Sequence, residues 1–165
     1  MYENLDIITI GEGLVELSSS TSLKFAQIFD KYYGGDSLCC AIAALRFGSS
    51  AGYITKLASD NFCEYLLDAW GSEGLDTSHI KLSQGQNGLY FVGKKENKSE
   101  FVFYRRKTAA MSLSIDDIDF GYIKNAKCVY ATGFVQSLSL SVREVVREIF
   151  KFAKENEILV AYDPN

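Results

Sequence analysis

The chain alternates between short, continuously apolar runs and longer segments in which apolar residues recur every three or four positions. Continuous runs are typical of strands buried on both faces of a sheet, whereas the longer spacing is typical of amphipathic helices. The runs that predict strands lie at residues 6–10, 14–17, 51–55, 128–133 and 158–163. The helical spacing covers residues 37–47, a segment from Asp60 to Gly71 or Gly74, and a segment that starts at Ser141. Because strands and helices alternate, the pattern predicts a parallel sheet covered by helices on both faces.

Polar residues mark the ends of these helices. Asp36 or Ser37 can cap the first helix, and Gly48 can end it. Ser141 and Glu144 have the spacing of a capping box, which predicts the start of the last long helix. A short helical turn is expected from Ser114.

An aromatic segment interrupts the alternation. Residues 87–94 and 99–106 are rich in strand-forming residues and are joined by the polar sequence KENKS, which indicates a hairpin. Since a hairpin does not fit the parallel pattern, we interpret it as a small antiparallel lid beside the main sheet.

Composition narrows the class of protein. The 165 residues are 47% hydrophobic and 23% charged, which is ordinary for one globular domain. The net charge of −4 disfavours nucleic acid or an anionic membrane as the main partner. No apolar run has membrane-spanning length, and the first residues, MYENLDIITIGEG, lack a signal-peptide pattern. We therefore expect a cytoplasmic protein without a membrane or nucleic-acid partner.

The cysteines and the histidine do not form a recognisable reactive pattern. The cysteines, Cys39, Cys40, Cys63 and Cys128, have no C-x-x-C spacing and no histidine nearby. We expect them to be small buried hydrophobic residues and expect no metal site. His79 is the single histidine and has no partner in sequence, so a serine or cysteine triad is disfavoured.

Two glycine pairs could admit a ligand close to the backbone. Gly34 and Gly35 precede the first helix, where amide donors and the positive end of the helix dipole lie, although a plain tight turn is the favoured explanation of the pair taken alone. Gly11 and Gly13 follow the first strand, but a third glycine of a dinucleotide-binding motif is absent, which favours a simple strand–turn–strand. The sequence has no P-loop motif.

The sequence YRRK at residues 104–107 could bind an anion. An arginine guanidinium pairs with a carboxylate or phosphate through two hydrogen bonds, but a charged strand edge that blocks strand pairing is an equal alternative. Tyr90 could donate its hydroxyl to the same space or be buried with a local partner. On a regular strand Tyr104 and Arg105 point to opposite faces, so both reach one ligand only if the strand bends there.

Several segments together carry a resemblance to a known family. They are, in chain order, GEGLVEL, GGDSL, SDNF, EGLDTSHI, NGLYFV, FYRRKTAAMSLS and YDPN. The chain resembles the amino-terminal half of the PfkB (ribokinase-like) sugar kinases over essentially its whole length, and among them most the 2-keto-3-deoxygluconate kinases. The resemblance implies an α/β fold with a three-layer, ribokinase-like parallel sheet and a small lid, incomplete at its carboxyl end. Residues 1–165 would then form a partial kinase domain, with lid strands at about 12–18, 31–35 and 87–107.

The resemblance also assigns roles to residues. It implies that Gly35, Tyr90, Tyr104 and Arg105 bind the substrate, with Arg105 suited to a sugar-acid carboxylate, and that Asn165 lies near the ATP phosphates. The family usually has asparagine where Cys39 stands, so one substrate contact is weakened here. The resemblance implies that the ATP pocket, the anion hole and the general-base aspartate of the family correspond to positions beyond residue 165. We therefore expect no catalytic residue within residues 1–165.

The function that follows is ATP-dependent, Mg²⁺-assisted phosphorylation of a small sugar or sugar acid, with 2-keto-3-deoxygluconate as the first choice and a homodimer formed through the lid. We expect the chain to be inactive by itself. The alternative is a truncated, non-catalytic remnant or sugar-binding module. A dinucleotide-dependent oxidoreductase would rest on Gly11 and Gly13 alone, and a lid that projects away from the sheet would argue against it.

Overall fold

The main sheet is parallel, as predicted from the buried apolar runs, and its strand order is β10-β9-β1-β4. The computed structural model describes residues 4–96 and 98–165. The strands of this sheet are β1 (Ile7–Ile10), β4 (Ala51–Ile54), β9 (Cys128–Thr132) and β10 (Leu159–Asp163). Their carboxyl ends lie at one edge of the sheet, where ligands bind in open α/β folds.

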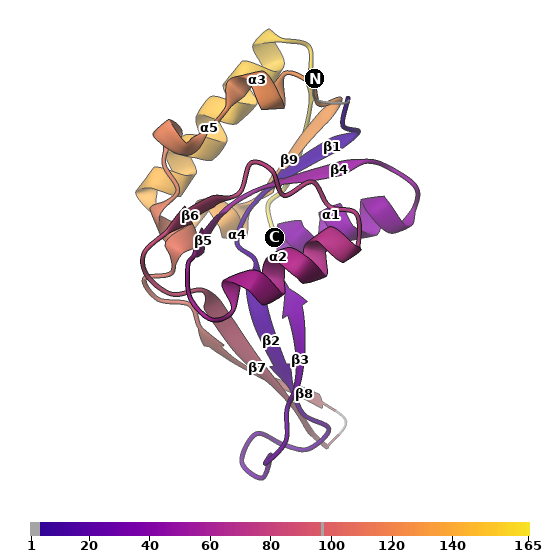
Figure 1. Ribbon diagram of the computed structural model, residues 1–165, viewed down its shortest axis with the longest axis vertical. Helices are drawn as coiled ribbons and strands as arrows, with labels where there is room; N and C mark the ends of the chain where they lie inside the picture. The colour runs from indigo at the N-terminus through magenta and orange to yellow at the C-terminus, as the bar shows by residue number, and fades with distance from the viewer. Residues whose placement is uncertain (1–3, 97) are drawn as a thin grey trace.

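Helices cover both faces of the main sheet and complete the three layers (Figure 1). On one face α1 (Asp36–Arg46) and α2 (Cys63–Ser72) bury a cluster that includes Leu38, Leu66 and Trp70. On the other face α5 (Leu140–Glu155) and α3 (Phe120–Ile123) bury a second cluster around Ile8 and Val146. The apolar spacing of each helix therefore faces the sheet, as expected.

A second sheet projects from one end of the molecule as the lid (Figure 1). Its strand order is β3-β2-β7-β8. The strands are β2 (Leu14–Ser18), β3 (Asp30–Gly34), β7 (Gly88–Lys95) and β8 (Lys98–Tyr104). The predicted hairpin of β7 and β8 is antiparallel, but β2 runs parallel to β7, so the lid sheet is mixed and not wholly antiparallel.

Short elements that the apolar pattern did not predict connect the larger ones. They are β5 (Lys56–Ala58), β6 (Lys81–Ser83), the 3₁₀ turn η1 (Ala109–Ser112) and α4 (Gly133–Gln136). The turn predicted from Ser114 is the 3₁₀ turn η2 (Ile115–Asp117). Ser114 and Asp117 form a capping box at its start.

Two of the predicted helix caps are wrong. The cap of α5 is Ser139, whose hydroxyl accepts from the Val142 amide at 3.1 Å, whereas the Ser141 hydroxyl donates to the Leu113 carbonyl. The helix therefore begins two residues before the predicted capping box. At α1 the cap position is Gly35, and the Asp36 carboxylate accepts from the amide of its neighbour Ser37.

Glu73 links the lid to the main body through hydrogen bonds. It follows α2 and accepts hydrogen bonds from Arg46 on α1 and from the Tyr33 hydroxyl on β3. These hydrogen bonds lower the pKa of Glu73 from its ordinary value of 4.5 to about 2, and the bond from Arg46 has the largest effect.

Protonation of Glu73 should accordingly weaken this link at low pH. A carboxyl whose pKa is lower in the folded state adds stability above its unfolded pKa and loses it as the pH falls toward the folded pKa. We expect the urea midpoint to fall between about pH 5 and pH 2, and to fall less steeply in Glu73→Gln. Urea unfolding of both proteins at several pH values checks this; identical slopes would show that Glu73 takes no part in the acid sensitivity.

Candidate functional site

A hollow lies where the carboxyl ends of the parallel strands meet the base of the lid, and we call it the strand-end hollow. Its volume is about 370 Å³. Its lining residues are Glu12, Leu14, Gly35, Asp36, Cys39, Tyr90, Phe101, Phe103, Phe134 and Asn165. Aromatic side chains of the lid thus face carboxylates and a helix start of the main body, the mixture that ligand sites in proteins commonly have.

The glycine pair at the start of α1 is required by its surroundings. Gly35 has a φ of +140°, and a Cβ atom there would lie 2.4 Å from the Glu12 carbonyl oxygen. A Cβ atom at Gly34 would lie 2.2 Å from the Tyr90 hydroxyl. The two glycines therefore let the β1–β2 connection and the lid tyrosine approach the backbone, and the bare Gly35 faces the hollow.

Tyr90 lines the hollow, and its hydroxyl has a local partner. The hydroxyl donates to the Glu16 carboxylate on the neighbouring strand β2, and the ring stacks on Phe103 with centroids 5.2 Å apart. The pKa of the Tyr90 hydroxyl is raised, mainly by burial and also by the hydrogen bond to Glu16. Tyr90 therefore stays neutral and can still accept a hydrogen bond from a ligand.

Arg105 reaches across from the end of β8 to the main body. Its Nε atom donates to the Glu12 carboxylate at 2.9 Å, and its Nη2 atom donates to the same oxygen. The guanidinium carbon lies 4.0 Å from the centre of the Phe134 ring. Since Glu12 and Phe134 both line the strand-end hollow, Arg105 is the cation beside it.

Tyr104 lies on the other face of the lid. Strand β8 is regular up to Tyr104, so successive side chains point to opposite faces. Tyr104 is 59% exposed and lines a separate groove with Asp60, Phe62, Asn87 and Phe91. The structure thus brings Gly35, Tyr90 and Asn165 to the hollow with Arg105 beside it, but it does not bring Tyr104 there.

The carboxylates at the hollow already have partners. Glu12 also accepts from the Thr108 hydroxyl at 2.5 Å, and Asp36 accepts from Thr132 and from the Ser37 amide. Over residues 4–96 and 98–165, no three His, Cys, Asp or Glu side chains gather where they could together hold a metal ion. An ion held by three such side chains is thus excluded within those residues, whereas Mg²⁺ is usually held by one or two carboxylates together with substrate phosphates. Asn165 is the lining residue that stands where the resemblance expects ATP.

The cysteines differ from the prediction. Cys63 is buried, but Cys39 is exposed and lines the hollow, while Cys40 and Cys128 are partly buried. A helix start that faces a hollow leaves its first-turn side chains uncovered, which the apolar pattern of α1 does not reveal. Although the residue as a whole is exposed, partial desolvation of its sulfur raises the pKa of the Cys39 thiol, so it remains protonated.

Sequence reasoning missed Glu12 and Phe134 as site residues. Each follows the carboxyl end of a buried parallel strand, β1 and β9 respectively, and that position was the available signal. The glycines beside Glu12 serve packing: a Cβ atom at Gly11 would lie 1.7 Å from the Ser37 hydroxyl, and one at Gly13 would lie 2.4 Å from the Trp70 ring. They are not a cradle for a dinucleotide.

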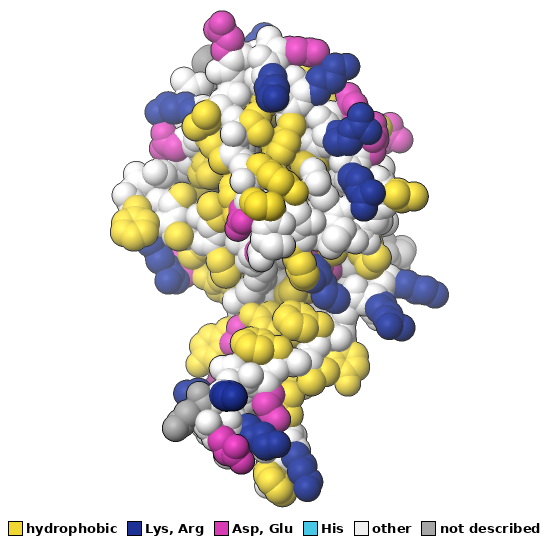
Figure 2. Space-filling view, turned by 180° about the vertical axis from the view of Figure 1, so that it is seen from behind, with side chains coloured by type: hydrophobic (Ala, Val, Ile, Leu, Met, Phe, Trp, Pro, Cys, Tyr) yellow, Lys and Arg dark blue, Asp and Glu magenta, His cyan; other side chains and the backbone are white. Residues whose placement is uncertain are grey.

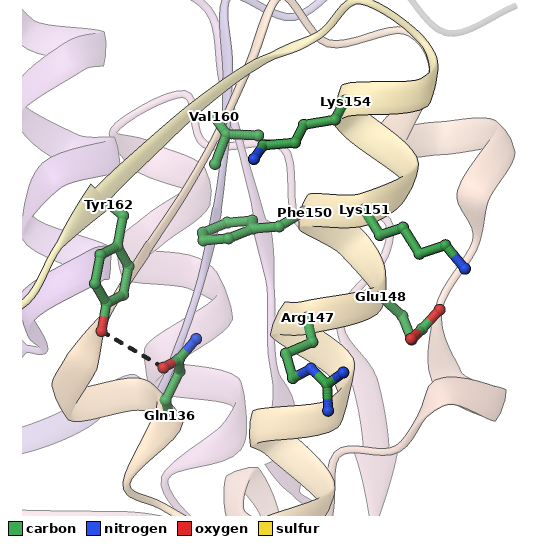
Figure 3. Close-up of a pocket in the computed structure, with 8 residues that line it drawn as sticks. All are labelled: Gln136, Arg147, Glu148, Phe150, Lys151, Lys154, Val160 and Tyr162. Carbon is green, nitrogen blue, oxygen red and sulfur yellow. Dashed lines mark hydrogen bonds between the residues drawn. The ribbon is translucent and has the colours of Figure 1, made fainter.

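Another groove lies at the open edge of the main sheet, between α5 and β10 (Figure 3). Phe150, Val160 and Tyr162 form its apolar side, and Lys154 extends over it beside Val160, whereas Lys151 and Glu148 point away (Figure 3). We call it the edge groove. Its charged lining residues all come from α5, namely Arg147, Glu148, Lys151 and Lys154.

None of the helices in the described part of the chain is long and apolar enough to cross a membrane.

Comparison with known proteins gives a consistent result. The model of the pfkB family carbohydrate kinases matches residues 5–165. A 5-dehydro-2-deoxygluconokinase of Clostridium beijerinckii is 33% identical over 96% of this chain and 48% of its own length. A 2-dehydro-3-deoxygluconokinase of Thermoproteus tenax is 29% identical over 91% of this chain and 48% of its own length.

A solved structure agrees with the fold. An uncharacterized sugar kinase of Pyrococcus horikoshii, in complex with ATP, matches 96% of this chain and 53% of its own with a TM-score of 0.86 and 29% identity. The chain thus spans about half the length of the curated relatives that it matches.

Proposed function

Because the chain belongs to the pfkB family of carbohydrate kinases, we propose that it provides the sugar-binding half of an ATP-dependent kinase acting on a keto-deoxy sugar acid. Two relatives are named for such substrates, 5-dehydro-2-deoxygluconate and 2-dehydro-3-deoxygluconate. The observation that carries the proposal is Arg105, a cation fixed beside the strand-end hollow and suited to a carboxylate.

The residues of the hollow would bind and orient the sugar acid. Arg105 would take the carboxylate, Tyr90 would accept from a hydroxyl, and the bare backbone at Gly35 would let the sugar lie against the start of α1. The aromatic lid residues Phe101 and Phe103 would exclude water from the reacting groups. In the transfer itself a sugar hydroxyl attacks the γ-phosphorus of ATP, a new P–O bond forms, and ADP leaves.

A kinase also needs a base for the hydroxyl proton and a site for the nucleotide. We propose ATP as the phosphate donor, with Asn165 near its phosphates, in keeping with the ATP complex of the Pyrococcus relative. Mg²⁺ would accompany the nucleotide, held by its phosphates together with one or two carboxylates, and would offset the negative charge of the phosphates.

A second candidate is sugar binding without phosphoryl transfer. It is favoured by the carboxylates of the hollow, because both Glu12 and Asp36 are held by hydrogen bonds and neither is placed as a free general base. A dinucleotide oxidoreductase is disfavoured, since the lid projects from the main sheet and the glycines after β1 pack against Ser37 and Trp70.

A thermal-shift screen separates these possibilities. A ligand that binds only the native state raises its stability, so 2-dehydro-3-deoxygluconate or 5-dehydro-2-deoxygluconate should raise the melting temperature more than neutral sugars do. If sugar acids bind, a coupled assay for ADP then decides between kinase and binding module. No shift with any sugar acid would contradict the proposal.

We also propose that a second copy of the chain covers the lid. The edge strand β8 exposes aromatic side chains on both faces, and Phe101 and Phe103 are 55% and 50% exposed. Figure 2 shows hydrophobic side chains gathered where the lid meets the body. An exposed edge strand with such a patch is suited to association. Light scattering should report a dimer, and Phe101→Ser with Phe103→Ser should report a monomer; a monomer for the unchanged chain would contradict this.

A further inference from the structure

The guanidinium of Arg105 is held on two sides by residues that no sequence motif assigned. Glu12 accepts from its Nε and Nη2 atoms, and the Phe134 ring lies 4.0 Å from its central carbon. The Arg105 side chain is 18% exposed and that of Glu12 3%. A planar cation between a carboxylate and an aromatic face has little freedom to turn.

Glu12 is itself fixed from two other directions. Its Oε1 atom accepts from the Thr108 hydroxyl at 2.5 Å, and its backbone carbonyl is the group that Gly35 accommodates at the start of α1. Glu12 thereby joins the β1–β2 connection, the segment after β8 and the floor of the strand-end hollow.

Glu12 leaves part of the guanidinium available. The group has five N–H donors, and Glu12 accepts from Nε and Nη2 along one edge. The Nη1 atom and the second hydrogen of Nη2 remain as donors, on a group that lies between two lining residues of the hollow. A ligand carboxylate can therefore pair with Arg105 while Glu12 stays in place.

We propose that Glu12 is a positioning residue, which holds Arg105 in the orientation that recognises the carboxylate of a sugar acid. This inference rests on the proposed function. An unheld arginine loses much rotamer freedom when a ligand binds, whereas Arg105 has already lost it in the free protein. The contribution of Glu12 is thus made through Arg105 and should vanish when Arg105 is absent.

The test is calorimetric titration of Glu12→Gln with 2-dehydro-3-deoxygluconate and with the neutral ketose fructose. We expect the Kd for the sugar acid to rise about 5- to 20-fold, and the Kd for the ketose to change less than about twofold. In an Arg105→Ala background, Glu12→Gln should change the Kd for the sugar acid less than about twofold, because the two residues act as a unit. Circular dichroism verifies that each variant is folded.

Phe134→Leu is the second variant, in case Glu12→Gln does not fold. It removes the aromatic face under the guanidinium but leaves the ion pair, and it should weaken sugar-acid binding about 2- to 5-fold with little effect on the ketose.

Three results would overturn the inference: equal losses for both ligands, a gain in sugar-acid affinity, or an unchanged loss in the Arg105→Ala background. The first would show a merely structural role, and the second would show that Glu12 competes with the ligand. Failure of the unchanged protein to bind sugar acids would contradict the proposed function itself.

Discussion

Arg105→Ala is expected to weaken binding of 2-dehydro-3-deoxygluconate by about 10- to 150-fold and to affect a neutral ketose much less. The reason is that a charge-assisted hydrogen bond between Arg105 and the carboxylate contributes roughly 1.5–3 kcal/mol to binding. A neutral sugar has no carboxylate and does not form this bond. Arg105→Lys should restore only part of the loss, because an ammonium group does not reproduce the planar fork that pairs with a carboxylate. Calorimetric titration with both ligands measures the difference.

The same substitution should also lower stability, because it removes the cationic partner of Glu12 in its buried ion pair. Removing one partner of a buried pair costs about 3–5 kcal/mol, since it leaves a charge uncompensated. The double variant Arg105→Ala with Glu12→Gln should recover much of this stability but not the affinity. Binding and urea unfolding measured on the same variants therefore separate the two roles.

Arg106 is the matched control. It is the next residue along the chain, its side chain is exposed, and its backbone carbonyl accepts from the Gln86 amide group. Arg106→Ala should change the Kd for the sugar acid less than about twofold, as is usual for an exposed charge. If Arg105→Ala lowers the affinity for the two ligands equally, or if Arg106→Ala has the larger effect, the assignment moves toward a neutral-sugar kinase.

Gly35→Ala is expected to destabilise the chain by roughly 2–4 kcal/mol, because two costs add at this position. Its φ of +140° is a conformation that residues with a side chain rarely adopt. The new Cβ atom would also lie 2.4 Å from the Glu12 carbonyl oxygen, so α1 and the β1–β2 connection would have to separate. Because both segments line the strand-end hollow, ligand binding should be lost together with stability.

Substitutions at two other glycines serve as controls for the backbone strain and for the steric contact at Gly35. Gly48 has a φ of +90° but nothing within 4 Å of a Cβ atom, so Gly48→Ala should show the strain alone, about 1 kcal/mol. Gly71 lies within α2 with open space around it, so Gly71→Ala should be neutral or stabilise by up to about 1 kcal/mol. Urea unfolding of the three variants checks the order. A Gly35→Ala protein as stable as Gly48→Ala would show that the Glu12 carbonyl moves aside freely.

The main sheet and its helices could be predicted because their signals are local. The runs that form β1 and β9 are apolar at nearly every position, and α5 keeps its apolar spacing from Val142 to Ala153. The start of α5 was predicted wrongly because Ser139 and Ser141 both have suitable hydroxyls, and only tertiary contacts decide which one caps the helix. The strands β5 and β6 have three residues each, too few for a periodic pattern.

The candidate site was predictable only in part, because its contacts are long-range. Glu12 and Arg105 are 93 residues apart, and nothing in the spacing of either segment indicates that they meet. Tyr104 shows the opposite case. The alternation of side chains along a strand already implied that it and Arg105 point to different faces, and the structure follows that local rule.

The most direct measurement is an NMR titration of the ¹⁵N-labelled chain with 2-dehydro-3-deoxygluconate. If the strand-end hollow binds the sugar acid, we expect the shift changes to centre on the backbone amides of Gly35 and Tyr90 and on the Nε signal of Arg105. Changes centred instead on Phe150 and Tyr162 in the edge groove, or on Tyr104 and Asn87 on the other face of the lid, with Gly35 unaffected, would contradict it.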